Sequence, residues 1–169
     1  EYRQQQLESQ IIETPVSLAD LYPTLCGLCD IDVPDKLEGQ NLLSAINNQN
    51  EPESVPVYCD ALSPRWGEGT EFRMIRQGKY KYVGFRDAPE LLFDLEEDPL
   101  EQNNLVNSTD DKIKDMLNHF RDLMDETMDF DAAESERKKD KKLYETNGLE
   151  IPEGTGNAYL MPDKRLVEA

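Results

Sequence analysis

The clearest alternation of apolar and polar positions lies in the middle of the chain. Two β-rich runs, residues 72–76 and 79–83, are separated only by Gln77-Gly78. A two-residue loop that contains glycine is typical of a β-hairpin, because the tight turn requires a positive φ angle that glycine adopts without steric cost. Residues 55–59 and 91–95 have the composition of two further strands. We therefore expect a small antiparallel sheet.

The predicted hairpin carries apolar side chains on both faces. Counting outward from the Gln-Gly loop, Ile75 lies opposite Tyr80. On the same face, Arg73 lies opposite Tyr82. The other face carries Phe72, Met74 and Val83. Because side chains two residues apart share a face of a strand, this pattern favours a strand pair that is covered on both sides.

Apolar residues at three- and four-residue spacing predict two helices. The first covers about residues 18–29, with Asp20 as its N-cap and a stripe formed by Leu18, Leu21, Leu25 and Leu28. The second covers about residues 109–128, with Ser108 or Thr109 as its N-cap. Its stripe consists of Ile113, Met116, Leu117, Phe120, Leu123 and Met124.

The segment after residue 95 is predicted to begin another helix. Asp98 would cap it, and Pro99 would occupy the first turn, where its missing N–H is harmless. Glu101 would reach back to the backbone of the cap.

The last part of the chain is highly charged. Residues 131–147 are predicted to form a solvated helix or linker, in which Glu134 and Lys138 have the spacing of an i,i+4 ion pair. Two short apolar runs then flank Pro162-Asp163-Lys164, which indicates a second hairpin.

The composition limits the partners of the chain. Its 169 residues include 36 acidic and 18 basic side chains, a formal net charge of −18. Nucleic acids and anionic membranes bind basic surfaces, so we expect neither as a partner. No signal peptide and no apolar run long enough to span a bilayer is found. Because the chain begins at Glu1 without methionine, we interpret it as part of a longer polypeptide.

The cysteines and the single histidine indicate no particular chemistry. Cys26 and Cys29 form a CxxC pair, but a metal site would need two further ligands, and only Cys59 and His119 remain. A redox pair would lie at the start of a helix, whereas this one lies near a predicted helix end. We expect Cys26 and Cys29 to be buried small apolar residues. His119 lies off the apolar stripe of its helix, and we expect it to face solvent.

Several motifs in order resemble one known family. Residues 73–83 have the sequence R-M-I-R-Q-G-K-Y-K-Y-V, and residues 90–105 have E-L-L-F-D-L-E-E-D-P-L-E-Q-N-N-L. Upstream are V-S-L-A-D-L-Y-P-T-L, I-D-V-P and L-E-G-Q-N-L-L, which begin at residues 16, 31 and 37. This pattern closely resembles the C-terminal part of the formylglycine-dependent (type I) sulfatases, in the alkaline-phosphatase-like superfamily.

The resemblance implies a fold class and a division into domains. The class is α/β for the parent protein and α+β for this segment, with an antiparallel sheet of about four strands packed on a C-terminal helix. Residues 1–50 would form the C-terminal edge of the catalytic domain, including the helix at about 18–29. Residues 51–130 would form the small C-terminal subdomain. Residues 131–169 would form a charged helix or linker and a hairpin tail.

The resemblance also implies where the catalytic chemistry lies. In these sulfatases a Cys or Ser in C/S-x-P-x-R is oxidised to formylglycine, and a calcium ion held by Asp and Asn residues polarises the sulfate. The nearest string here, Leu62-Ser63-Pro64-Arg65, lacks the required spacing. We therefore expect formylglycine and calcium in the parent enzyme but no catalytic or metal-binding residue in this segment.

Substrate contact is the remaining functional role that the sequence allows. The loop from Asp60 to Thr70 joins two predicted strands, and loops on rigid scaffolds often carry function. Arg65 is a candidate to pair with a sulfate or uronate, and Trp66 is a candidate to stack on a sugar ring. Alternatively, Trp66 covers the edge of the hairpin and Arg65 pairs with surface carboxylates. Arg73 is expected to be structural, with a buried carboxylate partner.

The leading hypothesis is therefore the C-terminal part of a sulfatase that hydrolyses sulfate esters of a sulfated carbohydrate. Its partners would be the N-terminal catalytic domain of the same polypeptide and the sulfated substrate. One alternative keeps the superfamily but changes the reaction, to that of a phosphodiesterase or phosphonate hydrolase. Another is a non-catalytic acidic module for packing or oligomerisation.

Overall fold

The computed structural model describes residues 11–37, 39–48, 51–63, 67, 69–146, 158–160 and 166–168. These residues fall into two compact units, Glu1–Met128 and Asp129–Ala169. Each unit is described by itself below.

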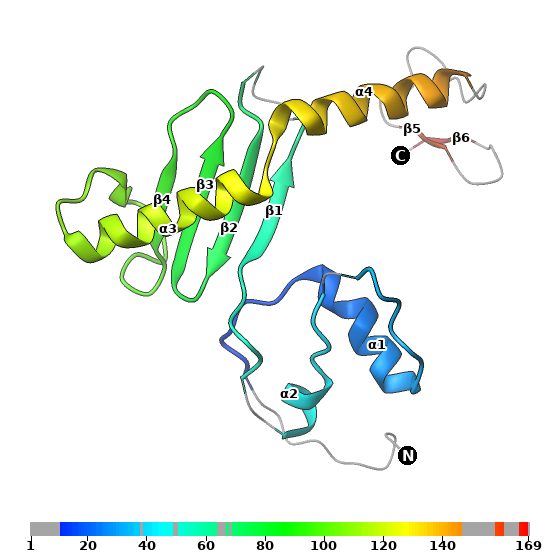
Figure 1. The fold of residues 1–169 in the computed structure, drawn as a ribbon, viewed down its shortest axis with the longest axis horizontal. Coiled ribbons are helices and arrows are strands. Elements are labelled where there is room, and N and C mark those ends of the chain that lie inside the picture. Colours follow the sequence, from blue (N-terminus) through cyan, green and yellow to red (C-terminus); the bar gives the residue numbers. More distant parts are fainter. Residues whose placement is uncertain are drawn as a thin grey trace. The chain divides into compact units, whose positions relative to one another are not determined.

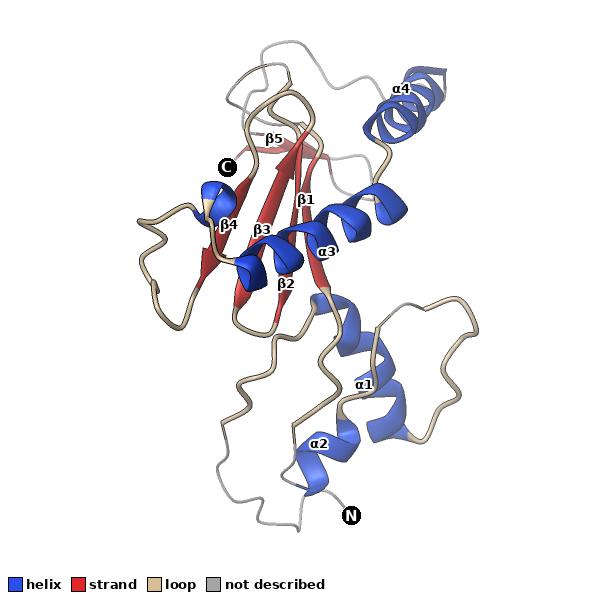
Figure 2. Cartoon of the chain, turned by 60° about the vertical axis from the view of Figure 1, so that its left-hand side comes forward, coloured by secondary structure: helices blue, strands red, loops and turns tan. Residues whose placement is uncertain are grey.

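A four-stranded antiparallel sheet forms the centre of the first unit (Figure 1). Its strands follow the order of the sequence: β1 (Val57–Ala61), β2 (Phe72–Gln77), β3 (Tyr80–Phe85) and β4 (Leu91–Asp94). The helix α3 (Asp111–Thr127) lies across one face of this sheet (Figure 2). The predicted architecture, a small antiparallel sheet packed on a C-terminal helix, is confirmed.

The hairpin between β2 and β3 turns one residue later than predicted. Gly78 and Lys79 form the loop, so that Ile75 pairs with Tyr82 rather than with Tyr80. Gly78 has a φ angle of 54° and stands first in the loop, the position that glycine takes in II′ hairpins. The register therefore shifts by two residues. Because side chains alternate with a period of two, each keeps its predicted face.

The core lies between α3 and the sheet. Ile75, Leu92 and Phe120 are fully buried. The ring of Tyr82 stacks on that of Phe120, with 5.7 Å between centroids. The remaining apolar residues of the predicted stripe pack against this cluster: Ile113, Met116, Leu117, Leu123 and Met124. The stripe on residues 109–128 is thus confirmed, and its burial supplies the main hydrophobic stabilisation of the unit.

The N-cap of α3 differs from the prediction. Asp110, rather than Ser108 or Thr109, accepts a hydrogen bond from the backbone N–H of Lys112 at 2.8 Å. A carboxylate at this place is also favoured by the positive end of the helix dipole. Ser108 instead accepts a hydrogen bond from the N–H of Asp110, at 3.2 Å, and so orders the residue before the helix.

The prediction that a helix begins at Asp98 is wrong. Residues 98–101 form a turn, because Glu101 adopts a left-handed φ of 55° and its N–H donates to the carbonyl of Asp98 at 3.1 Å. The Glu101 carboxylate then pairs with Lys81 of β3 at 2.7 Å. The chain continues to the short 3-10 helix η3 (Leu105–Asn107).

Asn104 joins this connection to the outer strand of the sheet. Its Oδ1 accepts from the N–H of Leu92 at 3.0 Å, and its Nδ2 donates to the carbonyl of Glu90 at 3.3 Å. The same Oδ1 accepts from the N–H of Val106, which caps η3. The Asn104 side chain thus provides hydrogen-bond partners for backbone groups of both the strand and the start of η3.

The elements near the N-terminus are η2 (Leu18–Asp20), α1 (Leu21–Cys29) and α2 (Leu43–Asn48). Ser17, not Asp20, caps the start, in a capping box in which Asp20 is the acidic partner. The buried Asp20 carboxylate accepts from the N–H groups of Ser17 and Gln40, both at 2.7 Å. A Cβ on Gly39 would lie 2.1 Å from the carbonyl oxygen of Ala19, so only glycine permits this close approach.

The leucine stripe of η2 and α1 is not covered by the described residues. Leu18, Leu21 and Leu25 are 85%, 56% and 57% exposed. Because this helix is predicted to belong to the edge of the catalytic domain, the core that its stripe faces stays a prediction. Cys26 is buried as expected, but Cys29 is exposed, because it lies on the last turn of the helix.

The second unit contains α4 (Phe130–Thr146) and a two-stranded sheet of β5 (Ala158–Leu160) and β6 (Leu166–Glu168). Glu134 and Lys138 form the predicted ion pair at 2.6 Å. Both the charged helix and the terminal hairpin are confirmed. No helix in the described part of either unit has the length and apolarity needed to cross a membrane.

The core packing predicts a large difference between two leucine substitutions. Leu117 of α3 is 4% exposed, whereas Leu143 of α4 is 60% exposed. We expect Leu117→Ala to lower the free energy of unfolding by about 2–5 kcal/mol, because it leaves a cavity. Leu143→Ala should change it by less than about 0.5 kcal/mol. Urea denaturation of the complete protein measures both, and equal effects would contradict the described core.

Candidate functional site

The loop between β1 and β2 is the part of the sheet predicted to contact substrate, and its base is firmly held. The N–H of Asp87 donates to the carbonyl of Gly69, and the N–H of Arg86 to that of Glu71, both at 2.9 Å. Gly69 is buried with a φ angle of 83°, and a Cβ there would lie 3.0 Å from the Asp87 side chain. The loop therefore starts from a defined backbone position.

The two predicted substrate-binding residues, Arg65 and Trp66, lie outside the described residues. Their contact with substrate remains a prediction. The described flank of the loop is ordered by the Thr70 hydroxyl, which donates to the carbonyl of Gly67 at 2.7 Å.

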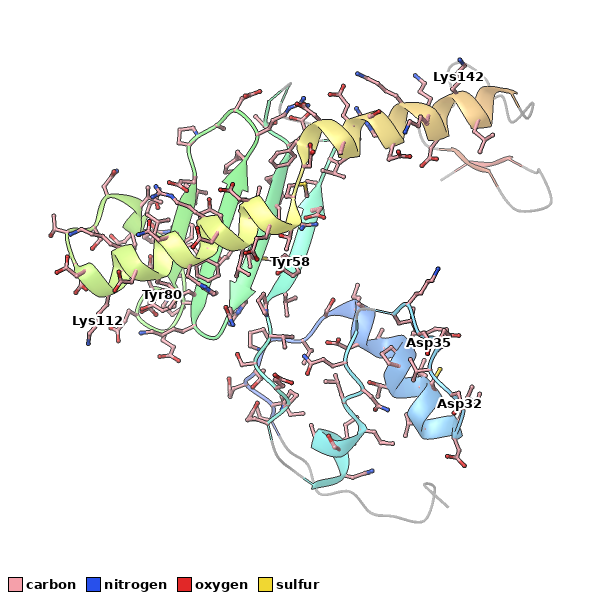
Figure 3. All side chains as sticks on the ribbon, in the orientation of Figure 1. Asp32, Asp35, Tyr58, Tyr80, Lys112 and Lys142 are labelled. Atoms are coloured by element: carbon pink, nitrogen blue, oxygen red, sulfur yellow. The ribbon has the colours of Figure 1, made fainter. Side chains whose placement is uncertain are left out.

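A bidentate ion pair lies next to the loop, on the face of the sheet that α3 covers. Arg73 of β2 donates to both carboxylate oxygens of Asp60 on β1, at 2.8 and 2.7 Å. Its remaining nitrogen donates to the carbonyl of Thr127, in the last turn of α3. The guanidinium also lies 5.0 Å from the ring centre of Tyr58, the tyrosine labelled on β1 in Figure 3. Arg73 thus joins two strands and a helix end, the structural role expected for it. Its partner is not buried as predicted, because the Asp60 side chain is 31% exposed at the edge strand β1.

A polar hollow of about 560 Å³ lies beside this ion pair. Its lining includes Asp20, Gln40, Tyr58, Asp60, Arg73 and Thr127. The charged groups among these are engaged with each other or with backbone N–H groups, as described above. The hollow therefore offers shape and polarity but no reactive group.

A second charged network holds the middle of α3 to the sheet. Tyr82 donates to Glu90 at 2.8 Å, and Arg121 of α3 pairs with the same carboxylate. The hydrogen bonds from Arg121 hold the pKa of Glu90 below its usual value. Burial, together with the bond to Glu90, raises the pKa of the Tyr82 hydroxyl. Because the folded pKa of Glu90 is depressed, its stabilising contribution is present at neutral pH and is lost as the pH falls through that pKa.

The described residues do not form a reactive centre. No three or more His, Cys, Asp or Glu side chains among them are grouped so as to hold a metal ion. His119 is exposed, as predicted, and its Nε2 lies 2.9 Å from Oε1 of Gln77, at the end of β2 that is remote from the loop. Cys26, Cys29 and Cys59 are free thiols.

The acidic partners in these networks are distant in sequence and were not predicted. Asp60, Glu90 and Glu101 are 13, 31 and 20 residues from the basic side chains that they bind. Asp60 could have been inferred only from the pairing of β1 with β2, which places it opposite Arg73.

Comparison with known proteins assigns the chain to a family. A family model described as N-sulphoglucosamine sulphohydrolase, C-terminal, matches residues 2–129. The chain belongs to this family of sulfatase C-terminal domains. The resemblance seen in the motifs is thereby confirmed.

Individual sulfatases agree with this assignment. Arylsulfatase K of Xenopus laevis is 34% identical over 126 residues, which are 69% of this chain and 23% of that protein. Choline-sulfatase of Rhizobium meliloti (strain 1021) is 35% identical over 149 residues, which are 82% of this chain and 28% of that protein. The solved structure of a 2-O GAG sulfatase superposes with a TM-score of 0.53 and 33% identity, over 63% of this chain and 23% of that one. The sulfatase domain thus spans about a quarter of the length of these relatives.

The ion pair between Asp60 and Arg73 predicts a measurable coupling. The side chain of Arg73 is 15% exposed and that of Asp60 is 31% exposed. In a double-mutant cycle of Asp60→Asn and Arg73→Met, we expect a coupling of about 1 kcal/mol in urea denaturation of the complete protein.

The matched control is the pair of Asp111 and Lys114, whose side chains are 93% and 51% exposed. The same substitutions there should give a coupling below about 0.5 kcal/mol. A coupling at Asp60 and Arg73 no larger than in the control would show that this pair is incidental.

Proposed function

We propose that the chain is the C-terminal part of a sulfatase that hydrolyses sulfate esters of a carbohydrate. The match of residues 2–129 to a sulfatase C-terminal family is the observation that carries this proposal. The name of the 2-O GAG sulfatase supports a carbohydrate substrate. The name of choline-sulfatase suggests choline sulfate as a small ester whose hydrolysis can be compared with that of a sulfated carbohydrate.

Within that enzyme, the domain would buttress the catalytic part of the same polypeptide. The exposed leucines of α1 support this role, since an amphipathic helix normally buries its apolar stripe against another element. Residues 1–50 would then belong to the edge of the catalytic domain, and residues 51–130 would form the subdomain that packs beside it.

The loop between β1 and β2 would line one side of the substrate cleft. Its pinned base at Gly69 and Glu71 supports this, because a substrate-contacting loop needs a rigid scaffold to position its side chains. Arg65 would pair with a sulfate or carboxylate group, and Trp66 would stack on a sugar ring.

Formylglycine and calcium would be supplied by the preceding part of the polypeptide. The acidic groups of the described residues are spread over separate ion pairs rather than gathered into a cation site. When bound, calcium polarises the sulfate and formylglycine provides the nucleophile. The residues described here would act only on the position of the substrate and of the catalytic domain.

The proposed chemistry requires formylglycine in the parent protein. Peptide mass mapping of the complete native protein should find a C/S-x-P-x-R peptide with the mass of a Cys or Ser oxidised to an aldehyde. The purified protein should release sulfate from a sulfated oligosaccharide. A native polypeptide that lacks this motif would overturn the sulfatase proposal and favour a packing module.

The loop between β1 and β2 is expected to select the substrate. Arg65→Ala and Trp66→Ala should each lower kcat/KM for a sulfated oligosaccharide by about 10- to 100-fold, because each removes a charged or stacking contact of about 1.4–2.8 kcal/mol. Turnover of choline sulfate and of a small aryl sulfate should change by less than about threefold, since these substrates are too small to reach both contacts.

A matched control is Lys112→Ala. Lys112 is an exposed cation on the first turn of α3 and projects away from the sheet (Figure 3). This substitution should change none of the three activities. If Arg65→Ala and Trp66→Ala affect the large and the small substrates equally, the loop does not select the substrate.

A further inference from the structure

The face of the sheet opposite α3 is largely apolar and only partly covered by the described residues: Cys59 is exposed, Val83 is buried, and the side chains between them are half-buried. Cys59, Met74, Val83 and Leu91 are register partners across all four strands, and so form one continuous row on this face. Phe72 and Phe85, also partners, extend the apolar surface toward the end that carries the loop. These six side chains line a hollow of about 520 Å³. We call this surface the open face.

A second row on the open face contains a half-buried cation. Arg76 of β2 lies opposite Val57 on one side and Lys81 on the other. Lys81 is neutralised by Glu101. The Nε atom of Arg76 is buried and has no hydrogen-bond partner among the described residues.

The unpaired Nε atom of Arg76 indicates that a hydrogen-bond acceptor lies outside the described residues. A buried donor that loses its water without gaining a partner is unfavourable, and native proteins avoid it. Lys81, the neighbouring cation, already has Glu101 as its partner, whereas Nε of Arg76 has none among the described residues. An anionic group near Arg76 would supply the acceptor. A carboxylate fits best, since the planar guanidinium binds it through two parallel hydrogen bonds.

The size of the relatives indicates where such a group could come from. This chain spans 23% of arylsulfatase K of Xenopus laevis and 28% of choline-sulfatase of Rhizobium meliloti. A domain of this kind therefore occurs beside a much larger part of the same polypeptide. A sheet with two apolar faces requires a layer on each, and α3 supplies only one.

We propose that the open face packs against the catalytic part of the same polypeptide, and that a carboxylate of that part pairs with Arg76. The inference deepens the proposed function, on which it rests for the existence of the catalytic part. The contact surface would consist of alternate residues of β1–β4. It would contain one charged residue, Arg76, surrounded by apolar side chains, which is the usual composition of a stable interface.

Cys59 provides a natural probe of this contact. Its thiol is exposed in the described part of the chain and lines the hollow on the open face. In the complete native protein, we expect a maleimide to label Cys59 at least about tenfold more slowly than a cysteine introduced as Lys112→Cys, as read from peptide masses. Tenfold protection corresponds to an opening cost of about 1.4 kcal/mol. Equal rates would mean that the face is open and would overturn the proposal.

Substitution of Arg76 tests the anchor. Arg76→Met keeps much of the side-chain volume but removes the charge, and it should speed the labelling of Cys59 by about tenfold relative to the unsubstituted protein. Arg76→Lys keeps the charge and should retain part of the protection. Lys112→Met, the control, should leave the rate unchanged. Unchanged protection in Arg76→Met, with the protein folded by circular dichroism, would refute the carboxylate anchor.

Two further measurements distinguish the catalytic part from two other covers of the open face, the C-terminal unit and a second copy of the chain. Deletion of residues 129–169 should leave Cys59 protected; a gain of reactivity would identify the C-terminal unit as the cover and overturn the proposal. Protection should also be independent of protein concentration, because a dependence would indicate a second copy of the chain instead. The outcome is separate from the proposed function: sulfatase activity with an unprotected Cys59 would refute only this inference, and protection without sulfate release would refute only the proposed function.

Discussion

The burial of one helix face against one sheet face is the interaction on which the first unit depends. Ile75, Tyr82 and Leu92 form a row across three strands, and Leu117 and Phe120 of α3 close it from above. The apolar row fixes the register of the strands, because a shift by one residue would turn these side chains to the other face. The register in turn fixes where β1 ends and β2 begins, and so where the loop between them starts.

The charged pairs around this core set the position of α3 rather than its stability. Arg73 holds the last turn of the helix through the Thr127 carbonyl, and Arg121 holds its middle through Glu90. Both arginines bind carboxylates that are partly buried, so each pair has a defined geometry and only a modest energy. Together with the apolar row they hold the helix to the sheet at its middle and at its end.

Sequence periodicity predicted the elements whose pattern is local. The stripe around Phe120, the faces of the hairpin and the pair of Glu134 and Lys138 all depend on spacings of two to four residues. The features that were missed depend on distant partners. Glu101 leaves the predicted helix because Lys81 lies within reach, and Asp60 is recognisable only once β1 lies beside β2. The hairpin register was missed because Gly78 can stand first or second in a two-residue loop. Arg65 and Trp66, the candidate site, were predicted from their place in a loop between two strands, and their contact with substrate stays a prediction.

Asn104 has a consequence for how the sheet ends. The outer edge of β4 would otherwise present free N–H and C=O groups, which form a template for another strand. The amide of Asn104 binds both the N–H of Leu92 and the carbonyl of Glu90, and so takes the place that an incoming strand would need. Edge-to-edge aggregation at β4 is thereby blocked by a single side chain of the domain's own loop. The other edge strand of the described sheet is β1.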